Sequence, residues 1–238
     1  VEALRARQVD VYADKRHRLE RARRMVAGTH IVGQYTWEPF ALMYRHNDPF
    51  FANLVTLTFQ DMAADGTRDA LFDRWLPGTS PPSGPNWPGD APTPSLEETP
   101  QQLATGDVIA RIQQRGAVVM GFFTDRWPYS AVRNDGVPTG FELRLVERLV
   151  ERWLGSRQAI TYTVVTENPD ASVADAFRQL NQGEIDILVG DWMHTREAEL
   201  HVDFSIPVFD DGVSILSNGY APMENIEALA GYAVGVIA

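Results

Sequence analysis

A short apolar run, Ile185–Val189, is interrupted only by Asp186 and stands between two glycines, Gly183 and Gly190. Short, branched, glycine-bounded runs of this kind are typical of buried strands in α/β sheets. The polar residues after Gly190 form a loop at the carboxyl end of that strand, where open α/β sheets bind ligands. We therefore expect the stretch Gly183–Asp211 to hold both a central strand and a binding loop.

The alternation of strand and helix patterns from residue 117 onward predicts a mixed, mostly parallel α/β sheet with crossover helices. The expected helices are Val108–Arg115, Phe141–Leu154 and Ala174–Leu180, and the expected strands are Ala117–Gly121, Ile160–Val165 and Val213–Ser217. Earlier in the chain, helical spacing of apolar residues predicts a helix around Leu54–Met62 and another around Leu71–Trp75.

Residues 77–102 contain eight of the fifteen prolines and show no apolar periodicity. Such a composition favours an extended, semi-rigid chain that packs poorly. We therefore expect residues 77–107 to be a linker between two parts of the chain.

Composition excludes several classes of protein. A net charge of −11 argues against nucleic acid as a partner. No apolar run approaches the roughly 18 residues of a membrane span, and the charged start Val1–Asp10 does not resemble a signal peptide. The chain contains no cysteine, so neither disulfides nor thiolate metal sites are expected.

Positive charge gathers at the start of the chain, where residues 1–28 hold eight Lys and Arg against four Asp and Glu. The run Lys15–Arg24 has helical character, and its expected buried face is Leu19, Ala22, Met25 and Val26. A nucleic-acid or membrane arm is one interpretation. A solvated helix face is favoured, because Glu20 interrupts the run and few aromatic residues flank it.

The segment GEIDILVGDWMHTREAELHVDFSIPVFDDG, residues 183–212, resembles the type 2 periplasmic solute-binding proteins of the polar amino-acid family, bacterial extracellular solute-binding protein family 3. Further pieces occur in the family's order: GAVVMG at Gly116–Gly121, the proline-aromatic at Trp127–Tyr129, NDGVPTGFELRL at Asn134–Leu145 and IEALAGYAVGV at Ile226–Val236. This resemblance covers Val108–Ala238 nearly continuously. It implies a periplasmic-binding-protein type II lobe with helices flanking the sheet.

The first 76 residues resemble later parts of the same family. VEALRARQVDVYADKRHRL is similar to the late second lobe, HIVGQYTWEPF to the return crossing, and residues 47–76 to the C-terminal helices. The resemblance thus implies the end of one solute-binding domain at 1–76 and the first-lobe part of another at 108–238, as a permutant or in a tandem protein. We expect residues 30–76 and 108–218 to pack as one lobe. The rival arrangement is two lobe fragments without a shared core.

The resemblance also implies a ligand site. In the family an arginine after the loop holds the ligand carboxylate, the loop glycine presents its backbone and a second-lobe aspartate holds the ammonium group. These roles fall on Arg196, Gly190 and Asp14, and the other expected contacts are Asp191, Trp192, Trp127 and Tyr129. The sequence departs from the family pattern at Trp192, which replaces a threonine, at Arg126, which replaces a stacking aromatic, and at Arg144, which replaces an acid.

From the residues alone, Arg196 has two interpretations. Its guanidinium is a permanent cation whose fork of donors suits a carboxylate. The other interpretation is an ordinary surface arginine that pairs with Glu197 or Glu199, and the residues alone favour it.

The expected function is non-enzymatic binding of a small amino-acid-like solute for ABC-type transport, with membrane permease subunits as partners and a periplasmic or cell-surface location. Alternatives are a ligand-sensing domain of a receptor or kinase, and a dehydratase that uses Glu197 or Asp191 as general acid. No nucleophile triad, phosphate loop or zinc motif is present, and no cofactor or metal is expected. His194 and His201 are a weak metal pair, and Asp210–Asp211 is either a solvated turn or a cation site.

Overall fold

The computed structural model describes residues 2–84, 96, 107–165, 173–218 and 226–236. Most of the predicted linker 77–107 lies outside the described residues. The chain divides into two units, one of Val1–Pro39 with Asp210–Ala238 and one of Phe40–Phe209. Among the described helices, none has both the length and the apolar character needed to cross a membrane.

The larger unit is built on a five-stranded sheet with the order β11-β4-β10-β5-β9. The strands are β4 (Met43–Arg45), β5 (Val118–Phe122), β9 (Ile160–Val164), β10 (Ile187–Val189) and β11 (Val202–Phe204). β5 pairs in parallel with both β10 and β9, whereas β4 is antiparallel to its neighbours β10 and β11. Four of the strands therefore run in one direction, and the predicted mixed, mostly parallel sheet is confirmed.

β4 comes from the segment before the linker, yet it lies between β11 and β10, in a sheet whose other strands all follow the linker. Its residue Met43 pairs with Leu188 on one side and Phe204 on the other. The expected packing of 30–76 against 108–218 is thus confirmed for residues 40–76 and 108–209, while 30–39 and 210–218 belong to the smaller unit. The assignment of 1–76 and 108–238 to tandem domains stays a prediction.

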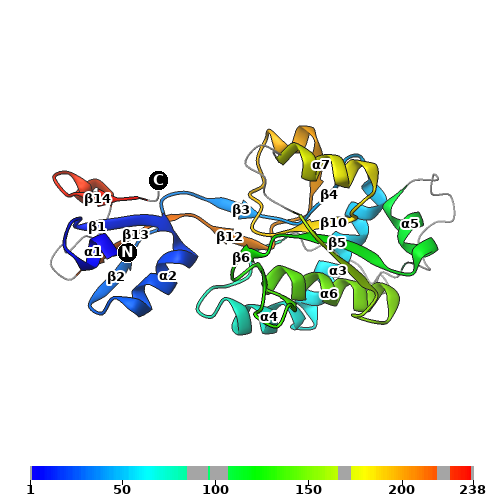
Figure 1. Cartoon of the computed structure of the whole chain (residues 1–238), viewed down its shortest axis with the longest axis horizontal. Coiled ribbons are helices and arrows are strands. Elements are labelled where there is room, and N and C mark those ends of the chain that lie inside the picture. Colours follow the sequence, from blue (N-terminus) through cyan, green and yellow to red (C-terminus); the bar gives the residue numbers. More distant parts are fainter. Residues whose placement is uncertain (1, 85–95, 97–106, 166–172, 219–225, 237–238) are drawn as a thin grey trace. The chain divides into compact units, whose positions relative to one another are not determined.

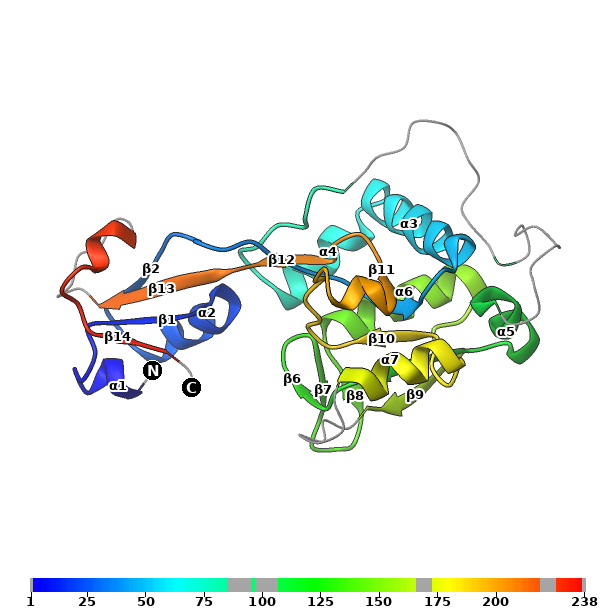
Figure 2. The same ribbon diagram turned by 90° about the horizontal axis from the view of Figure 1, so that it is seen from above.

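Helices cover both faces of this sheet (Figures 1 and 2). The helices α3 (Pro49–Ala64), α4 (Thr67–Trp75), α5 (Val108–Arg115) and α6 (Phe141–Leu154) bury their apolar faces in one cluster, and α7 (Val173–Gln182) contributes to a second cluster on the other face. The observed bounds of α5 and α6 are those predicted. The other predicted elements are present with ends shifted by one to five residues.

One buried carboxylate ties the two segments together. Asp48 is the N-cap of α3, where its Oδ1 accepts a hydrogen bond from the Phe51 N–H at 3.0 Å. Its Oδ2 accepts a second bond, at 2.9 Å, from the N–H of Val108 at the start of α5. A further link joins α6 to α3, because the indole of Trp153 donates to the Thr58 hydroxyl at 2.8 Å. All three hydrogen bonds are buried, so losing any of them leaves an unsatisfied polar group.

A small three-stranded antiparallel sheet joins β5 to α6. It consists of β6 (Asp125–Arg126), β7 (Ser130–Val132) and β8 (Pro138–Thr139). Asp135–Gly136 form the turn of a hairpin, since β7 pairs with β8 and Gly136 has a φ of +79°. Gly140 then begins α6 in close contact with the preceding chain, because a Cβ there would lie 2.2 Å from the Tyr129 carbonyl oxygen.

The smaller unit contains a four-stranded sheet with the order β14-β1-β13-β2. Its elements are α1 (Glu2–Arg5), β1 (Val11–Lys15), α2 (Arg16–Met25), β2 (Thr29–Val32), β13 (Val213–Asn218), η2 (Ile226–Leu229) and β14 (Val234–Gly235). The basic segment is the helix α2, with Leu19 and Ala22 buried as predicted. The expectation for Met25 is wrong: it is 62% exposed because it stands in the last, outward-facing turn.

Two short strands, β3 (Glu38–Phe40) and β12 (Phe209–Asp211), pair where the chain passes from one unit to the other. The interpretation of Asp210–Asp211 as a solvated turn is wrong for Asp211, which is fully buried. Its carboxylate contacts the imidazole Nδ1 of His17 within the smaller unit.

The shared sheet leads to a prediction for limited proteolysis. Cleavage within 77–107 should leave the two fragments associated on a sizing column without denaturant, because the pairing of β4 and the hydrogen bond from Val108 to Asp48 both join residues on the two sides of the cut. The replacement Asp48→Ala removes a helix cap and a buried tie, and should lower the free energy of unfolding by about 1–3 kcal/mol. Urea unfolding measures that change.

Separation of the nicked fragments in native buffer would contradict the shared sheet. Asp69→Ala is the matched control, since Asp69 is exposed in the first turn of α4 and should leave both the association and the stability nearly unchanged.

Candidate functional site

The loop after β10 begins with two residues in left-handed backbone conformations, Gly190 at φ +126° and Asp191 at φ +58°. Glycine is needed at the first position. A Cβ on Gly190 would lie 2.7 Å from the Phe123 ring and 3.0 Å from the Ser130 hydroxyl oxygen. The backbone of Gly190 is thus pressed against β7 and the residue after β5, at the carboxyl edge of the parallel strands.

Glu142 holds this loop in place. It stands in the first turn of α6 and is fully buried. Its Oε2 accepts a hydrogen bond from the Gly190 N–H, and the Asp191 N–H lies 3.3 Å from both of its carboxylate oxygens. One side chain therefore satisfies the two consecutive backbone donors that the turn directs inward.

The pKa of Glu142 is raised to about 8. Burial is the main cause, because the charged form loses its hydration. The Gly190 N–H opposes the shift, the charge of Asp191 adds to it, and the Asp191 N–H and the Arg126 guanidinium lower the pKa. The carboxyl group is therefore mostly protonated near neutral pH.

Arg126 approaches the same loop from β6. Its Nη1 donates to the Oδ1 of Asp191 at 2.9 Å, and its guanidinium lies over the Phe123 ring, 5.1 Å from the ring centre. Asp191 is only 8% exposed. At the position where the family has a stacking aromatic, this chain therefore places a cation that pairs with the loop.

Trp192 is half-buried. Its ring lies 5.4 Å from that of Phe123 and 6.2 Å from that of Phe177, and its backbone carbonyl accepts from the Ala41 N–H at 3.1 Å. The indole therefore packs against the second core cluster, with only part of the ring open to solvent. The expected contact of Trp192 with a ligand stays a prediction, and only the open part of the ring could make it.

Arg196 is exposed in the turn before the short 3₁₀ helix η1 (Ala198–Leu200). Thr195 caps this turn, because its hydroxyl oxygen accepts from the Ala198 N–H at 3.2 Å. Within the described part of the chain, Arg196 makes no ion pair with Glu197 or Glu199, and Glu199 instead contacts the imidazole of His194. The guanidinium is thus left available to a ligand.

The remaining predicted contacts are not gathered at the loop. Trp127 is 52% exposed and lies beside Trp75 of α4, with ring centres 5.6 Å apart and the ring planes tilted by 59°. Tyr129 is fully buried between Phe40 and Phe209, so it is a core residue here rather than a ligand contact. The proline-aromatic pattern predicted its place beside the loop but not the direction of its side chain.

Asp14 belongs to the smaller unit, on β1. Its Oδ1 accepts from the Lys15 N–H at 2.7 Å and lies 3.7 Å from an Arg18 nitrogen. Its assignment to a ligand ammonium group stays a prediction.

No cluster of three or more metal-ligating side chains occurs among the described residues. His194 stacks on Phe204, with ring centres 4.2 Å apart, and His201 stacks on Phe177 at 6.0 Å. The two imidazoles are thus engaged in packing on different aromatic rings.

Comparison with known proteins finds a family that resembles the part of the chain around this site. The family model of the bacterial extracellular solute-binding proteins, family 3, matches residues 118–226. The match starts at β5 and includes α6, β10 and the whole loop up to Arg196. Residues 118–226, a little under half of the chain, are therefore similar to this family of solute-binding proteins.

Solved structures give partial likenesses. The cysteine-binding protein from Campylobacter jejuni and the L-cysteine solute receptor of Neisseria gonorrhoeae are each 23% identical, with a TM-score of 0.35 over 40% of this chain and 36% of theirs. The arginine-bound domain 1 of TmArgBP is 22% identical, with a TM-score of 0.35 over 50% of this chain and 90% of that one. This chain thus spans about a third of the two cysteine-binding structures. A search of curated proteins finds no significant match.

Glu142 and its link to the loop were missed by the sequence analysis. An acid in the first turn of a helix is usually a solvated partner of the helix dipole, so the pattern favoured an exposed side chain. The available signal was its place directly after the Gly140–Phe141 pair, in the segment GFELRL that resembles the family.

The raised pKa of Glu142 predicts a pH dependence of stability. Its pKa is near 4.3 in the unfolded chain and about 8 in the folded chain, so between these values the folded state binds more protons. The contribution of Glu142 to the free energy of unfolding is complete below about pH 4.3 and is lost as the pH rises through about 8. Over this range the free energy of unfolding falls by up to about 1.4 kcal/mol per pH unit. Urea unfolding from pH 5 to 8 should show this slope in the wild type and lose it in Glu142→Gln.

Glu151→Gln on the same helix is the matched control, because its carboxylate is 38% exposed and pairs with Arg148 and Arg157. It should keep the wild-type slope. Identical pH profiles for the wild type and Glu142→Gln would show that Glu142 is ionised in the folded protein across this range.

Proposed function

We propose that this chain binds a small amino-acid-like solute at the loop Gly190–Arg196 without covalent chemistry. The observation that carries the proposal is the exposed Arg196, which follows a loop fixed by Glu142 at the carboxyl edge of the parallel strands. The match of residues 118–226 to a solute-binding family supports the same function.

The chemistry of the loop favours an anionic group on the solute. The Arg196 fork would hold a carboxylate through two parallel hydrogen bonds, which are stronger than neutral ones. Because Glu142 already accepts from the Gly190 N–H, Gly190 would present only its carbonyl group to the same solute, and Trp192 would contribute the open part of its ring.

The Arg126–Asp191 pair supports binding over catalysis. A general acid has to deliver its proton to a substrate, but the Asp191 carboxylate is buried and paired with a guanidinium. The other candidate acid, Glu197, is exposed in the turn beside Arg196.

The proposed role is capture of a solute and its delivery to the permease subunits of an ABC-type transporter, at a periplasmic or cell-surface location. Several neighbours in structure are named for amino-acid ligands, which agrees with this class of solute.

The test is calorimetric titration of the chain with a panel of the twenty amino acids. Arg196→Ala should weaken binding of the best ligand by roughly ten- to a hundred-fold, because charge-assisted hydrogen bonds contribute about 1.5–3 kcal/mol. Arg196→Lys keeps the charge without the fork and should recover only part of the affinity. The free energy of unfolding should barely change in either variant.

Arg178→Ala is the matched control, since Arg178 is a half-exposed arginine on α7 with its own partner, Glu184. It should bind like the wild type. Unchanged affinity in Arg196→Ala would contradict the assigned role of Arg196.

A further inference from the structure

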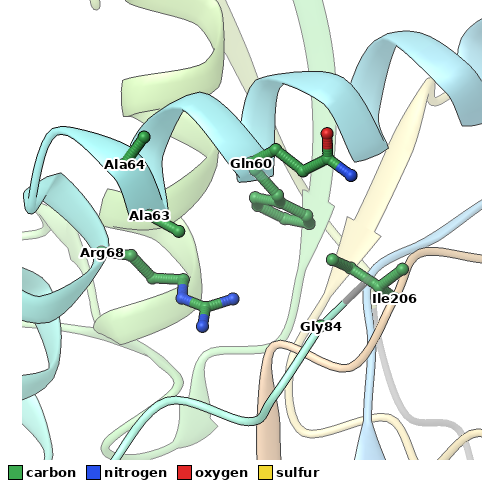
Figure 3. Close-up of a pocket in the computed structure, with 7 residues that line it drawn as sticks. Gln60, Ala63, Ala64, Arg68, Gly84 and Ile206 are labelled. Carbon is green, nitrogen blue, oxygen red and sulfur yellow. The ribbon is translucent and has the colours of Figure 1, made fainter. Parts of the chain in front are cut away.

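A pocket with a volume of about 280 Å³ lies beside the turn that joins α3 to α4. Figure 3 shows Arg68 reaching into it from α4, beneath Ala63 and Ala64 of α3, with Gly84 and Ile206 across the opening. None of the residues that line it belongs to the candidate solute site. The pocket is therefore a separate feature of the larger unit.

The Arg68 guanidinium brings a positive charge into the pocket. Its Nη2 donates to the carbonyl oxygen of Pro82 at 2.8 Å, which fixes the side chain. Among the described residues no carboxylate forms an ion pair with Arg68, and its Nε is buried without a hydrogen-bond partner there. Burial lowers the pKa of Arg68, and the charge of the neighbouring Asp69 opposes that shift. Among the described residues the guanidinium therefore has no carboxylate in direct contact, and it is partly dehydrated.

The facing wall of the pocket is apolar. Phe59, which is 2% exposed, lines the pocket, and Ile206 lies across it from Arg68 (Figure 3). A Cβ built on Gly84 would lie 3.2 Å from the Ile206 Cδ1 and 3.9 Å from the Arg68 Nη1. The absence of a side chain at Gly84 therefore leaves room between the cation and the apolar wall.

We propose that this pocket binds a small carboxylate with a short apolar chain, such as a monocarboxylate of three to five carbons. The Arg68 fork receives the carboxylate, because planar anions match the guanidinium and a dehydrated cation gains most from a counter-ion. The chain lies against Ile206 and Phe59, where it removes apolar surface from water. The volume suits a ligand of this size and is below the usual range for larger cofactors.

The probe is sodium butyrate, added to the ¹⁵N-labelled chain and followed by two-dimensional NMR. Butyrate should cause saturable shifts of the Arg68 Nε–H and Gly84 amide signals, with a dissociation constant on the order of millimolar. Neutral butyramide, which has the same shape, should bind at least about ten-fold more weakly. Because this comparison uses the wild type, it does not depend on a variant that folds.

Two variants locate the site. Arg68→Gln should weaken butyrate binding by about ten-fold or more, and Ala63→Leu should weaken it by narrowing the pocket while the cation stays. Arg74→Gln is the matched control, because Arg74 is an exposed arginine of the same helix that does not line the pocket. It should leave the affinity unchanged.

Three results would overturn the proposal. These are equal binding of butyrate and butyramide, unchanged affinity in Arg68→Gln, and no saturable shift at Arg68 or Gly84 up to about 50 mM butyrate. Inorganic phosphate that binds as tightly as butyrate would show that the apolar wall contributes nothing, which also contradicts it.

Discussion

The insertion of β4 between β10 and β11 is the interaction on which the larger unit depends. β10 and β11 run in the same direction, so their backbone groups are connected through a strand that pairs with each of them antiparallel. Without β4, both strands would present unpaired backbone groups along the middle of the sheet, which is costly away from water. Residues before the linker thus complete a sheet whose other strands follow it.

The placement of the binding loop follows from this sheet. β10 ends at Val189, and the next residues turn sharply because Gly190 has no side chain to meet Phe123 or Ser130. Glu142 then anchors two backbone N–H groups of the turn from α6. Burying an ionised carboxyl group costs free energy, and the fold reduces this cost because Glu142 is held mostly in its protonated form. In the proposed function, a loop anchored in this way would hold Arg196 near a fixed position before a ligand arrives, which would lower the entropic cost of binding.

The sequence predicted the helix bounds correctly where they depend on residues close together in the chain. The bounds of α5 and α6 followed from their amphipathic spacing and from Gly116 and Gly155, both left-handed C-caps. The expected side-chain directions were less successful, because they depend on partners far along the chain. Tyr129 is directed into an aromatic cluster with Phe40 and Phe209, and Trp192 packs on Phe123 and Phe177. The Glu142 contact joins residues 48 positions apart, and no periodicity along the sequence encodes it.

Cross-strand NMR contacts of Met43 test the central claim, that β4 completes the sheet carrying the binding loop. In the intact chain, backbone protons of Met43 should show nuclear Overhauser effects both to Leu188 and to Phe204, its neighbours on the two sides. Protons on adjacent antiparallel strands are close enough for strong effects, because paired Cα atoms lie only about 4.5–5.5 Å apart. Direct effects between Leu188 and Phe204, with none from Met43 to either, would contradict this sheet.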